Sequence, residues 1–108
     1  MTMTILAEIA AERRRQIEVE GWTPEHDDAH REGSLAQAAA CYAAGTRWLA
    51  YHINADVQNP WRDLWPWDAT YWKDAPTRRN LIKAAALIVA EIERLDRAAL
   101  SRAKETGK

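Results

Sequence analysis

The sequence predicts an all-α protein with three main helices in an antiparallel bundle and a tryptophan- and proline-rich connection. Two long rows of apolar residues with helical spacing support this class, and no segment shows a strand pattern of comparable strength. The 108 residues suit a single domain, residues 1–108, with a modest core. Because two such rows leave apolar surface to cover in so short a chain, we expect a homodimer or a larger assembly.

The first helix is expected from about Thr4 to Glu20, where Gly21 provides a C-terminal stop. Its apolar stripe consists of Ile5, Leu6, Ile9 and Ile17. Thr23 and Pro24 then match a helix cap followed by a first-turn proline, which predicts a short helical turn over residues 24–31.

The second helix is expected to begin at Ser34, because Gly33 breaks the chain and Ser34 and Gln37 have the spacing of a capping box. Its apolar row alternates steps of four and three residues: Leu35, Ala39, Tyr42, Thr46, Leu49 and Ile53. Residues 55–76 then form a long connection in which short turns are expected, held against the helices by tryptophans. These are Trp61, Trp65, Trp67 and Trp72.

The third helix is expected to follow Pro76 and to run to about Arg102. It repeats the four-three spacing at Leu81, Ala85, Ile88, Ile92, Leu95 and Ala99. Two matching rows predict either antiparallel packing of the second and third helices or a coiled-coil-like bundle with a second subunit.

Composition argues against several classes of function. The formal net charge of -1 provides no global field for duplex nucleic acid or an acidic membrane. Cys41, the single cysteine, rules out an internal disulfide and is expected to be a buried, inert thiol. No stretch approaches the roughly 20 apolar residues of a membrane span, and the N-terminus has no secretory signal, so a cytoplasmic protein is expected.

The most informative segment is an acidic cluster between residues 18 and 32, in which only Arg31 and two histidines oppose the acids. Its acids are Glu18, Glu20, Glu25, Asp27, Asp28 and Glu32. Such a cluster repels itself unless a cation or a basic partner neutralises it, and carboxylates are ligands that Mg²⁺ prefers. We therefore expect a Mg²⁺ site built from Glu18, Glu20, Asp27, Asp28 and Glu32. The alternative is a solvated acidic surface whose members pair with neighbouring arginines.

His26 and His30 stand four residues apart, so one helix face would present both rings. A zinc site would use such a pair, but the sequence identifies no third ligand. Structural or supporting roles for the two histidines are the alternative.

Basic residues predict a phosphate site at the start of the third helix. The expected ligands are Arg15, Arg78, Arg79 and Lys83, with Trp22 and Trp67 covering a nucleobase. The alternatives are salt bridges between these cations and Asp68, Asp74 or the acidic cluster, and tryptophans that fill a core or an interface.

Several motifs give the chain a resemblance to small phage- and prophage-encoded proteins of unassigned function. They are the ERRRQ run at residues 12–16, EGWTPEHDDAH at 20–30, AAACYA at 38–43, WPWD at 65–68 and the segment 78–97. Members of that group carry an acid where this chain has Ser34, which weakens a metal site here if that acid is a ligand. More distantly, the chain is similar to the MazG-like nucleotide pyrophosphohydrolases, whose E-x-x-D motif is matched by Glu93 and Asp96.

Two functions follow as expectations. The first is a phage accessory protein that binds a phosphate-containing small molecule such as a nucleotide, with Mg²⁺-dependent hydrolysis if it is an enzyme. The second is a noncatalytic protein-interaction module that uses the tryptophan-rich segment.

Overall fold

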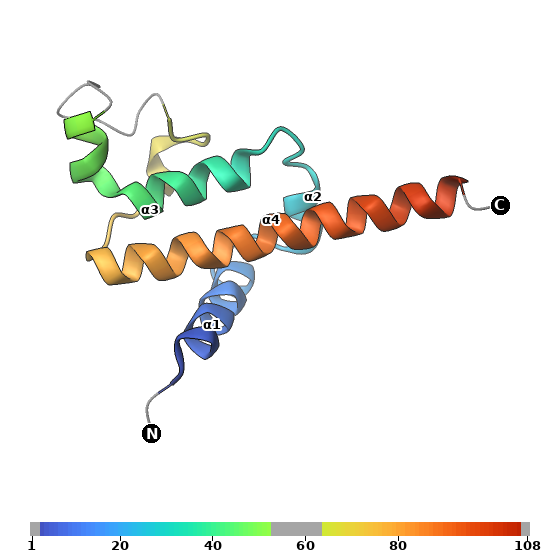
Figure 1. Ribbon diagram of the computed structural model, residues 1–108, viewed down its shortest axis with the longest axis horizontal. Coiled ribbons are helices and arrows are strands. Elements are labelled where there is room, and N and C mark those ends of the chain that lie inside the picture. The colour runs from blue at the N-terminus through green and yellow to red at the C-terminus, as the bar shows by residue number, and fades with distance from the viewer. Residues whose placement is uncertain (1–2, 53–63, 107–108) are drawn as a thin grey trace.

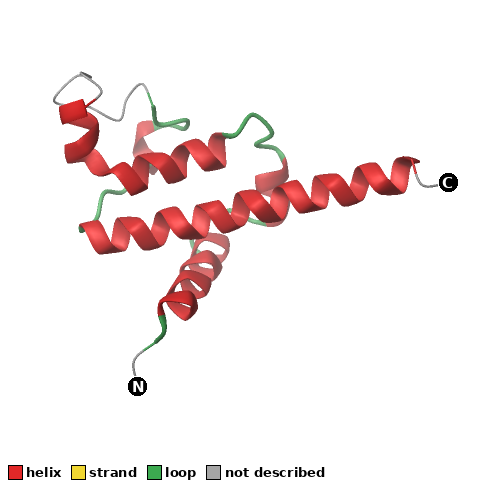
Figure 2. Ribbon diagram, viewed as in Figure 1, coloured by secondary structure: helices red, strands yellow, loops and turns green. Residues whose placement is uncertain are grey.

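The computed structural model describes residues 3–52 and 64–106, and within residues 46–52 it describes the backbone alone. The elements in chain order are α1 (Ile5–Glu18), α2 (Pro24–Asp28), α3 (Ser34–His52), the 3₁₀ helix η1 (Ala69–Tyr71) and α4 (Thr77–Thr106). Helices and loops account for all the described residues (Figure 2), so the predicted all-α class is confirmed for this part of the chain.

Helix α4 is the element against which α1, α2 and α3 pack (Figure 1). Its 30 residues correspond to a rod of roughly 45 Å. Helix α3 lies beside its N-terminal half and runs antiparallel to it, whereas α1 crosses α4 steeply on another side. The predicted bundle is therefore only partly correct, because α3 and α4 form an antiparallel pair but α1 does not align with them.

Threonine caps set the starts of the first two helices. The Thr4 hydroxyl accepts a hydrogen bond from the Ala7 amide at 3.1 Å, and the Thr23 hydroxyl accepts one from the His26 amide at 3.2 Å. The cap predicted at Thr23 is thus confirmed. Helix α1 ends at Glu18 and α2 ends at Asp28, both earlier than predicted. Between the two helices, Gly21 turns the chain with a φ of 78°.

Helix α3 begins at Ser34 as predicted, but the predicted capping box is wrong. The backbone N–H of Gln37 donates to the Gly33 carbonyl, so Gly33 occupies the cap position. The Ser34 hydroxyl is buried without a partner, and the Gln37 side chain donates instead to the Leu64 carbonyl. At Gly45 the backbone leaves helical geometry, with φ 79° and ψ 157°, and α3 kinks there.

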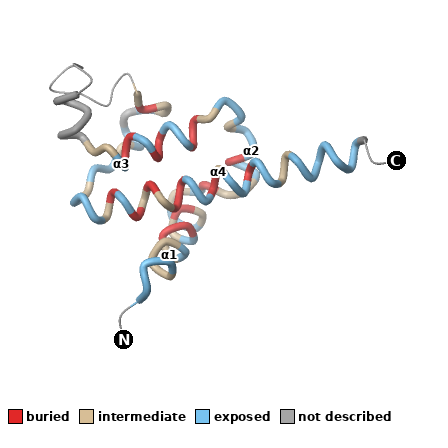
Figure 3. Tube along the Cα trace, in the orientation of Figure 1, coloured by how far each residue is buried: buried red, intermediate tan, exposed pale blue. Residues whose placement is uncertain are grey.

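The core lies between α3 and α4 (Figure 3), and small residues let the two helices approach closely. Three members of the predicted α3 row, Leu35, Ala39 and Tyr42, are buried in it. The other three, Thr46, Leu49 and Ile53, lie outside the described residues or side chains. Helix α4 contributes Ala84, Leu87 and Ala90, and Trp22 and Trp65 close the core.

The apolar row predicted for α4 does not face this core. Leu81, Ile88, Ile92 and Leu95 are 49%, 48%, 53% and 51% exposed. Helix α4 buries other positions instead, because α3 and α1 pack on the faces beside the row; they are Asn80, Ile82, Ala84, Ala86, Leu87, Ala90 and Arg94. The prediction that this row packs against the second helix is therefore wrong.

The molecule is extended for its length. Its radius of gyration is 15.5 Å, whereas a compact domain of this size has about 13 Å. In the described part of the chain, no helix is both long and apolar enough to span a membrane.

Candidate functional site

The acidic cluster predicted from the sequence lies where the end of α1, the turn at Gly21 and α2 meet α4. The Trp22 amide bonds to the Gln16 carbonyl at 3.0 Å, which folds the chain back over the end of α1. Trp22 is buried by this turn, and its carbonyl accepts a hydrogen bond from Arg13 at 3.0 Å. The turn thereby brings α2 against Arg13.

Asp27 and Arg13 form a buried ion pair at the centre of this region. The carboxylate Oδ2 lies 2.6 Å from the guanidinium, and the two side chains are 0% and 8% exposed. Burial raises the pKa of Asp27, and the nearby Arg13 charge opposes that shift without overcoming it. On its other side, Arg13 Nε lies 3.6 Å from Glu93. The acids of residues 18–32 and those near residue 93 therefore meet across an arginine, which supplies the positive charge that a metal ion would supply.

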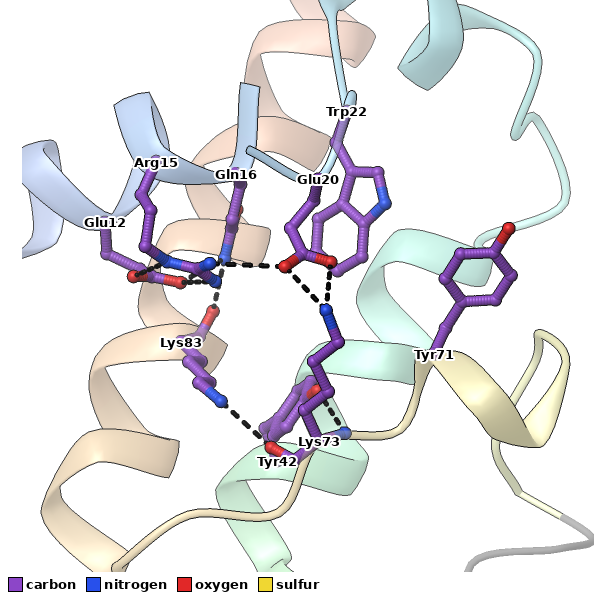
Figure 4. Close-up of a pocket in the computed structure, with 9 residues that line it drawn as sticks. All are labelled: Glu12, Arg15, Gln16, Glu20, Trp22, Tyr42, Tyr71, Lys73 and Lys83. Carbon is purple, nitrogen blue, oxygen red and sulfur yellow. Dashed lines mark hydrogen bonds and ion pairs between the residues drawn. The ribbon is translucent and has the colours of Figure 1, made fainter. Parts of the chain in front are cut away.

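Glu12 and Glu20 carry the second buried network (Figure 4). Glu12 accepts hydrogen bonds from Arg15 at 2.8 and 3.0 Å and also from Arg79. Glu20 accepts bonds from Arg15 at 3.2 Å and from Lys73 at 2.9 and 3.1 Å. Burial favours protonation of both glutamates, but their cationic donors outweigh it and hold both pKa values below the usual range.

The cavity inside this network is too small for a phosphate. Its volume is about 10 Å³, room for one water molecule at most. Lys83 lines it and donates to the Lys73 carbonyl at 2.9 Å, with its ammonium group 5.4 Å from the centre of the Tyr42 ring. Arg15 and Lys83, two of the predicted phosphate ligands, therefore line a space that a phosphate cannot enter.

The other two predicted phosphate ligands also hold carboxylates. Arg78 donates to both oxygens of Glu8 at 2.8 and 2.6 Å, and Arg79 donates to Glu12. The bond from the Arg78 side chain lowers the pKa of Glu8, although burial opposes it slightly. Salt bridges were the predicted alternative, but the partners are Glu8 and Glu12 of α1 rather than Asp68, Asp74 or the acidic cluster.

The five predicted Mg²⁺ ligands are not brought together. Glu18 and Glu32 are exposed, Asp28 accepts two bonds from Arg97 at 3.0 and 2.8 Å, and Glu20 and Asp27 sit in separate networks. Among residues 3–52 and 64–106, no group of three or more His, Cys, Asp or Glu side chains is placed to hold one metal ion.

The two histidines do meet. His26 Nε2 and His30 Nε2 are 3.4 Å apart, and the rings pack edge to face at 4.6 Å between centroids. Burial lowers the pKa of His30, and the neighbouring His26 ring lowers it further. A neutral His30 is therefore favoured at pH 7.

The described tryptophans form a chain of ring contacts that continues from this histidine pair. His30 lies 5.4 Å from Trp67, and Trp67 lies 5.3 Å from both Trp22 and Trp65. Trp72 stacks on Tyr42 at 4.7 Å, which attaches the connection to α3 as predicted. Trp48 and Trp61 lie outside the described side chains.

An open aromatic cleft of about 370 Å³ remains beside this chain of rings. We call it the aromatic cleft, and its lining residues are Glu20, Trp22, His26, His30, Trp67, Asp68 and Tyr71. It contains Trp22 and Trp67, which the sequence predicted as ligand-binding residues, but no lysine or arginine of the described residues lines it. Asp68 accepts bonds from the Thr70 amide and hydroxyl at 2.9 and 2.8 Å, which lower the pKa of its carboxyl.

Sequence reasoning did not identify the arginine at the centre or two of the seven residues that line the cleft, Asp68 and Tyr71. Arg13 lies in the ERRRQ run, directly after Glu12 and one turn before Gln16, and its place among these buried residues distinguishes it from exposed Arg14. Tyr71 and Asp68 carried no signal, because only the fold of the 64–73 segment brings them to α2.

Comparison with known proteins returned no family model, no curated protein and no solved structure that matches this chain.

Proposed function

We propose that this protein is a noncatalytic protein-interaction module that self-associates through the outer face of α4. The observation that carries the proposal is the row of large apolar side chains, spaced four and three residues apart, that remains exposed on this helix. We call Leu81, Ile88, Ile92 and Leu95 the α4 row.

The magnitude of the exposed surface supports association. Full burial of a leucine or isoleucine contributes about 1.5–3 kcal/mol. The α4 row is about half exposed. Covering that half in two copies would contribute roughly 6–12 kcal/mol, against an association cost of about 4–15 kcal/mol. A moderate, concentration-dependent dimer is the expected result.

A second copy of this chain is the partner that the row fits best. A four-three repeat packs knobs into holes against an identical repeat, and a twofold axis closes such a contact. The row runs from Leu81 through Ala85 to Leu95. None of its positions carries a charge that dimerisation would have to desolvate. The extended shape of the single chain also agrees with a fold that is completed by a partner.

Analytical ultracentrifugation over a wide concentration range tests the proposal. The wild-type chain should dimerise, and Ile92→Glu should weaken the dimer by at least about a hundredfold, because it places a charge in the apolar seam. Leu100→Glu is the matched control, since Leu100 is equally exposed on α4 but stands outside the row. A wild-type chain that stays monomeric at every concentration would refute the proposal.

Binding of a phosphate-containing ligand, such as a nucleotide, is the second candidate function, and a groove along the outer half of α4 favours it. The groove has a volume of about 610 Å³. Four arginines line it against two acids: Arg31, Arg94, Arg97 and Arg102, with Asp28 and Glu105. Guanidinium groups match phosphate oxygens in pairs, so this groove replaces the predicted cluster at Arg78 as the best phosphate site.

Thermal shift measurements with ADP, ATP and pyrophosphate, each with and without Mg²⁺, test this second function. A ligand should raise the melting temperature of the wild type, and Arg31→Ala should reduce that rise while Arg14→Ala, another exposed arginine, leaves it unchanged. An identical rise in Arg31→Ala would exclude the groove as the site.

A further inference from the structure

The aromatic cleft has a composition that selects the charge of its occupant. Aromatic and imidazole rings supply most of its walls, two carboxylates lie among them, and none of the described lysines or arginines does. A phosphate or carboxylate ligand would therefore meet the like charge of Asp68, which no described lysine or arginine pairs with. The faces of indole and phenol rings, which carry negative electrostatic potential, attract a cation instead.

The ring surface open to the cleft comes mainly from Trp67 and Tyr71, because Trp22 is only 6% exposed. Trp22 and Trp67 are tilted by 51° at 5.3 Å between centroids, so neither ring covers the face of the other as a parallel stack would. Tyr71 is half exposed beside them. A neutral His30, which burial favours, adds a fourth ring without adding positive charge.

Asp68 supplies the negative charge that remains available in the cleft. The carboxylate of Glu20 is already held by Arg15 and Lys73. Both bonds from Thr70 go to Oδ1 of Asp68, and no side chain or amide in the described part of the chain donates to Oδ2, which leaves Oδ2 to accept a bond from a ligand. A ring surface with one ionised carboxylate at its edge is the arrangement that binds an alkylated ammonium or guanidinium group.

We propose that the aromatic cleft binds the cationic head of a basic side chain, with Trp22, Trp67 and Tyr71 against the cation and Asp68 paired with it. The occupant is an arginine or lysine side chain of a partner protein. This site lies within one chain and goes beyond self-association through the α4 row.

Tryptophan fluorescence titrations with capped single amino acids test the inference. N-acetyl-arginine methylamide should give a saturable change, and the citrulline analogue, which has nearly the same shape but no charge, should give none. The capped lysine compound forms a second arm that tells a guanidinium preference from a general cation preference, and either preference supports the proposal.

Two variants assign the site. Asp68→Asn should weaken arginine binding by about five- to tenfold while its amide oxygen still accepts the Thr70 bonds, so the fold is kept. Trp67→Leu should weaken it at least as much, with a far-UV circular dichroism spectrum like that of the wild type as the folding control. Glu25→Gln, which neutralises an exposed acid on α2 outside the cleft, should have no effect.

The outcomes separate this inference from the proposed function. The Ile92→Glu variant should still bind capped arginine, because the cleft does not include the α4 row. Equal binding of the citrulline compound, unchanged binding in Asp68→Asn, or no saturable change at tens of millimolar arginine compound would each overturn the inference. Failure of dimerisation alone would leave it standing.

Discussion

Replacing Arg13 by methionine should destabilise the protein strongly at neutral pH and weakly in acid. The substitution keeps the length of the side chain but removes the guanidinium that pairs with the fully buried Asp27. It also removes the donor to the Trp22 carbonyl. The folded state must then hold Asp27 either as an unpaired buried anion or as a neutral acid.

The loss of stability reaches its upper limit if Asp27 stays protonated in the folded variant. Each unit between the pH and the ordinary carboxyl pKa costs about 1.4 kcal/mol when the group is forced to stay protonated. With an ordinary value of 3.8, the limit at pH 7 is about 4 kcal/mol. The lost hydrogen bond to Trp22 adds about 1 kcal/mol. The loss at pH 5 should be smaller by about 2–3 kcal/mol, because protonating Asp27 then costs less.

Urea unfolding followed by far-UV circular dichroism, at pH 7 and pH 5 and at one protein concentration, measures both losses. Arg14→Met is the control, since Arg14 is the exposed neighbour of Arg13 and should change stability by less than about 0.5 kcal/mol. Adding Asp27→Leu to Arg13→Met should restore much of the stability at pH 7. A loss that is small at pH 7, or equal at both pH values, would refute the role of the buried pair.

Three further predictions concern other parts of the fold. The lowered pKa values of Glu12 and Glu20 stabilise the folded state above their ordinary value of 4.5, so the free energy of unfolding should fall as the pH drops below it, and Glu20→Gln should flatten that dependence in urea titrations. The raised pKa of Asp27 acts in the opposite direction, and an unfolding free energy that rises from pH 5 to pH 3 would show that it dominates. Gly45→Ala should lower stability by about 1–3 kcal/mol, because a φ of 79° with a ψ of 157° suits glycine alone; an unchanged melting temperature would contradict the kink. Burial raises the pKa of Cys41 from 9.0 to about 11, so iodoacetamide at pH 8 should modify the folded chain about a hundredfold more slowly than the urea-unfolded chain, and equal rates would exclude a buried thiol.

Local signals in the sequence predicted the helices well. The start at Ser34, the cap at Thr23 and the turn at Gly21 depend on neighbouring residues, so each could be identified within a few positions. The predicted capping box does not form, because the Gln37 side chain donates to the carbonyl of Leu64, which lies 27 residues away. Contacts over such distances have no local signature.

For the candidate site too, the sequence showed local patterns but not the contacts between distant residues. The acids of residues 18–32 and the cations near Arg78 were both visible as charge clusters, and each was expected to attract an external ligand. The fold brings acids and cations together, so that Glu12, Glu20 and Asp27 are neutralised from within the chain. A one-dimensional pattern shows where charge is concentrated but not which opposite charge will be adjacent after folding.

The sequence by itself determined the all-α class, the helix starts and the four-three spacing on α4, because helix periodicity and capping act within a few residues. Only the tertiary structure decided which face of α4 is buried and where the aromatic cleft opens. Alanines at positions 84, 86 and 90 allow α3 and α1 to approach α4 more closely than its leucines and isoleucines would. Close packing on that small-residue face leaves the α4 row on the outside, where a second copy can cover it.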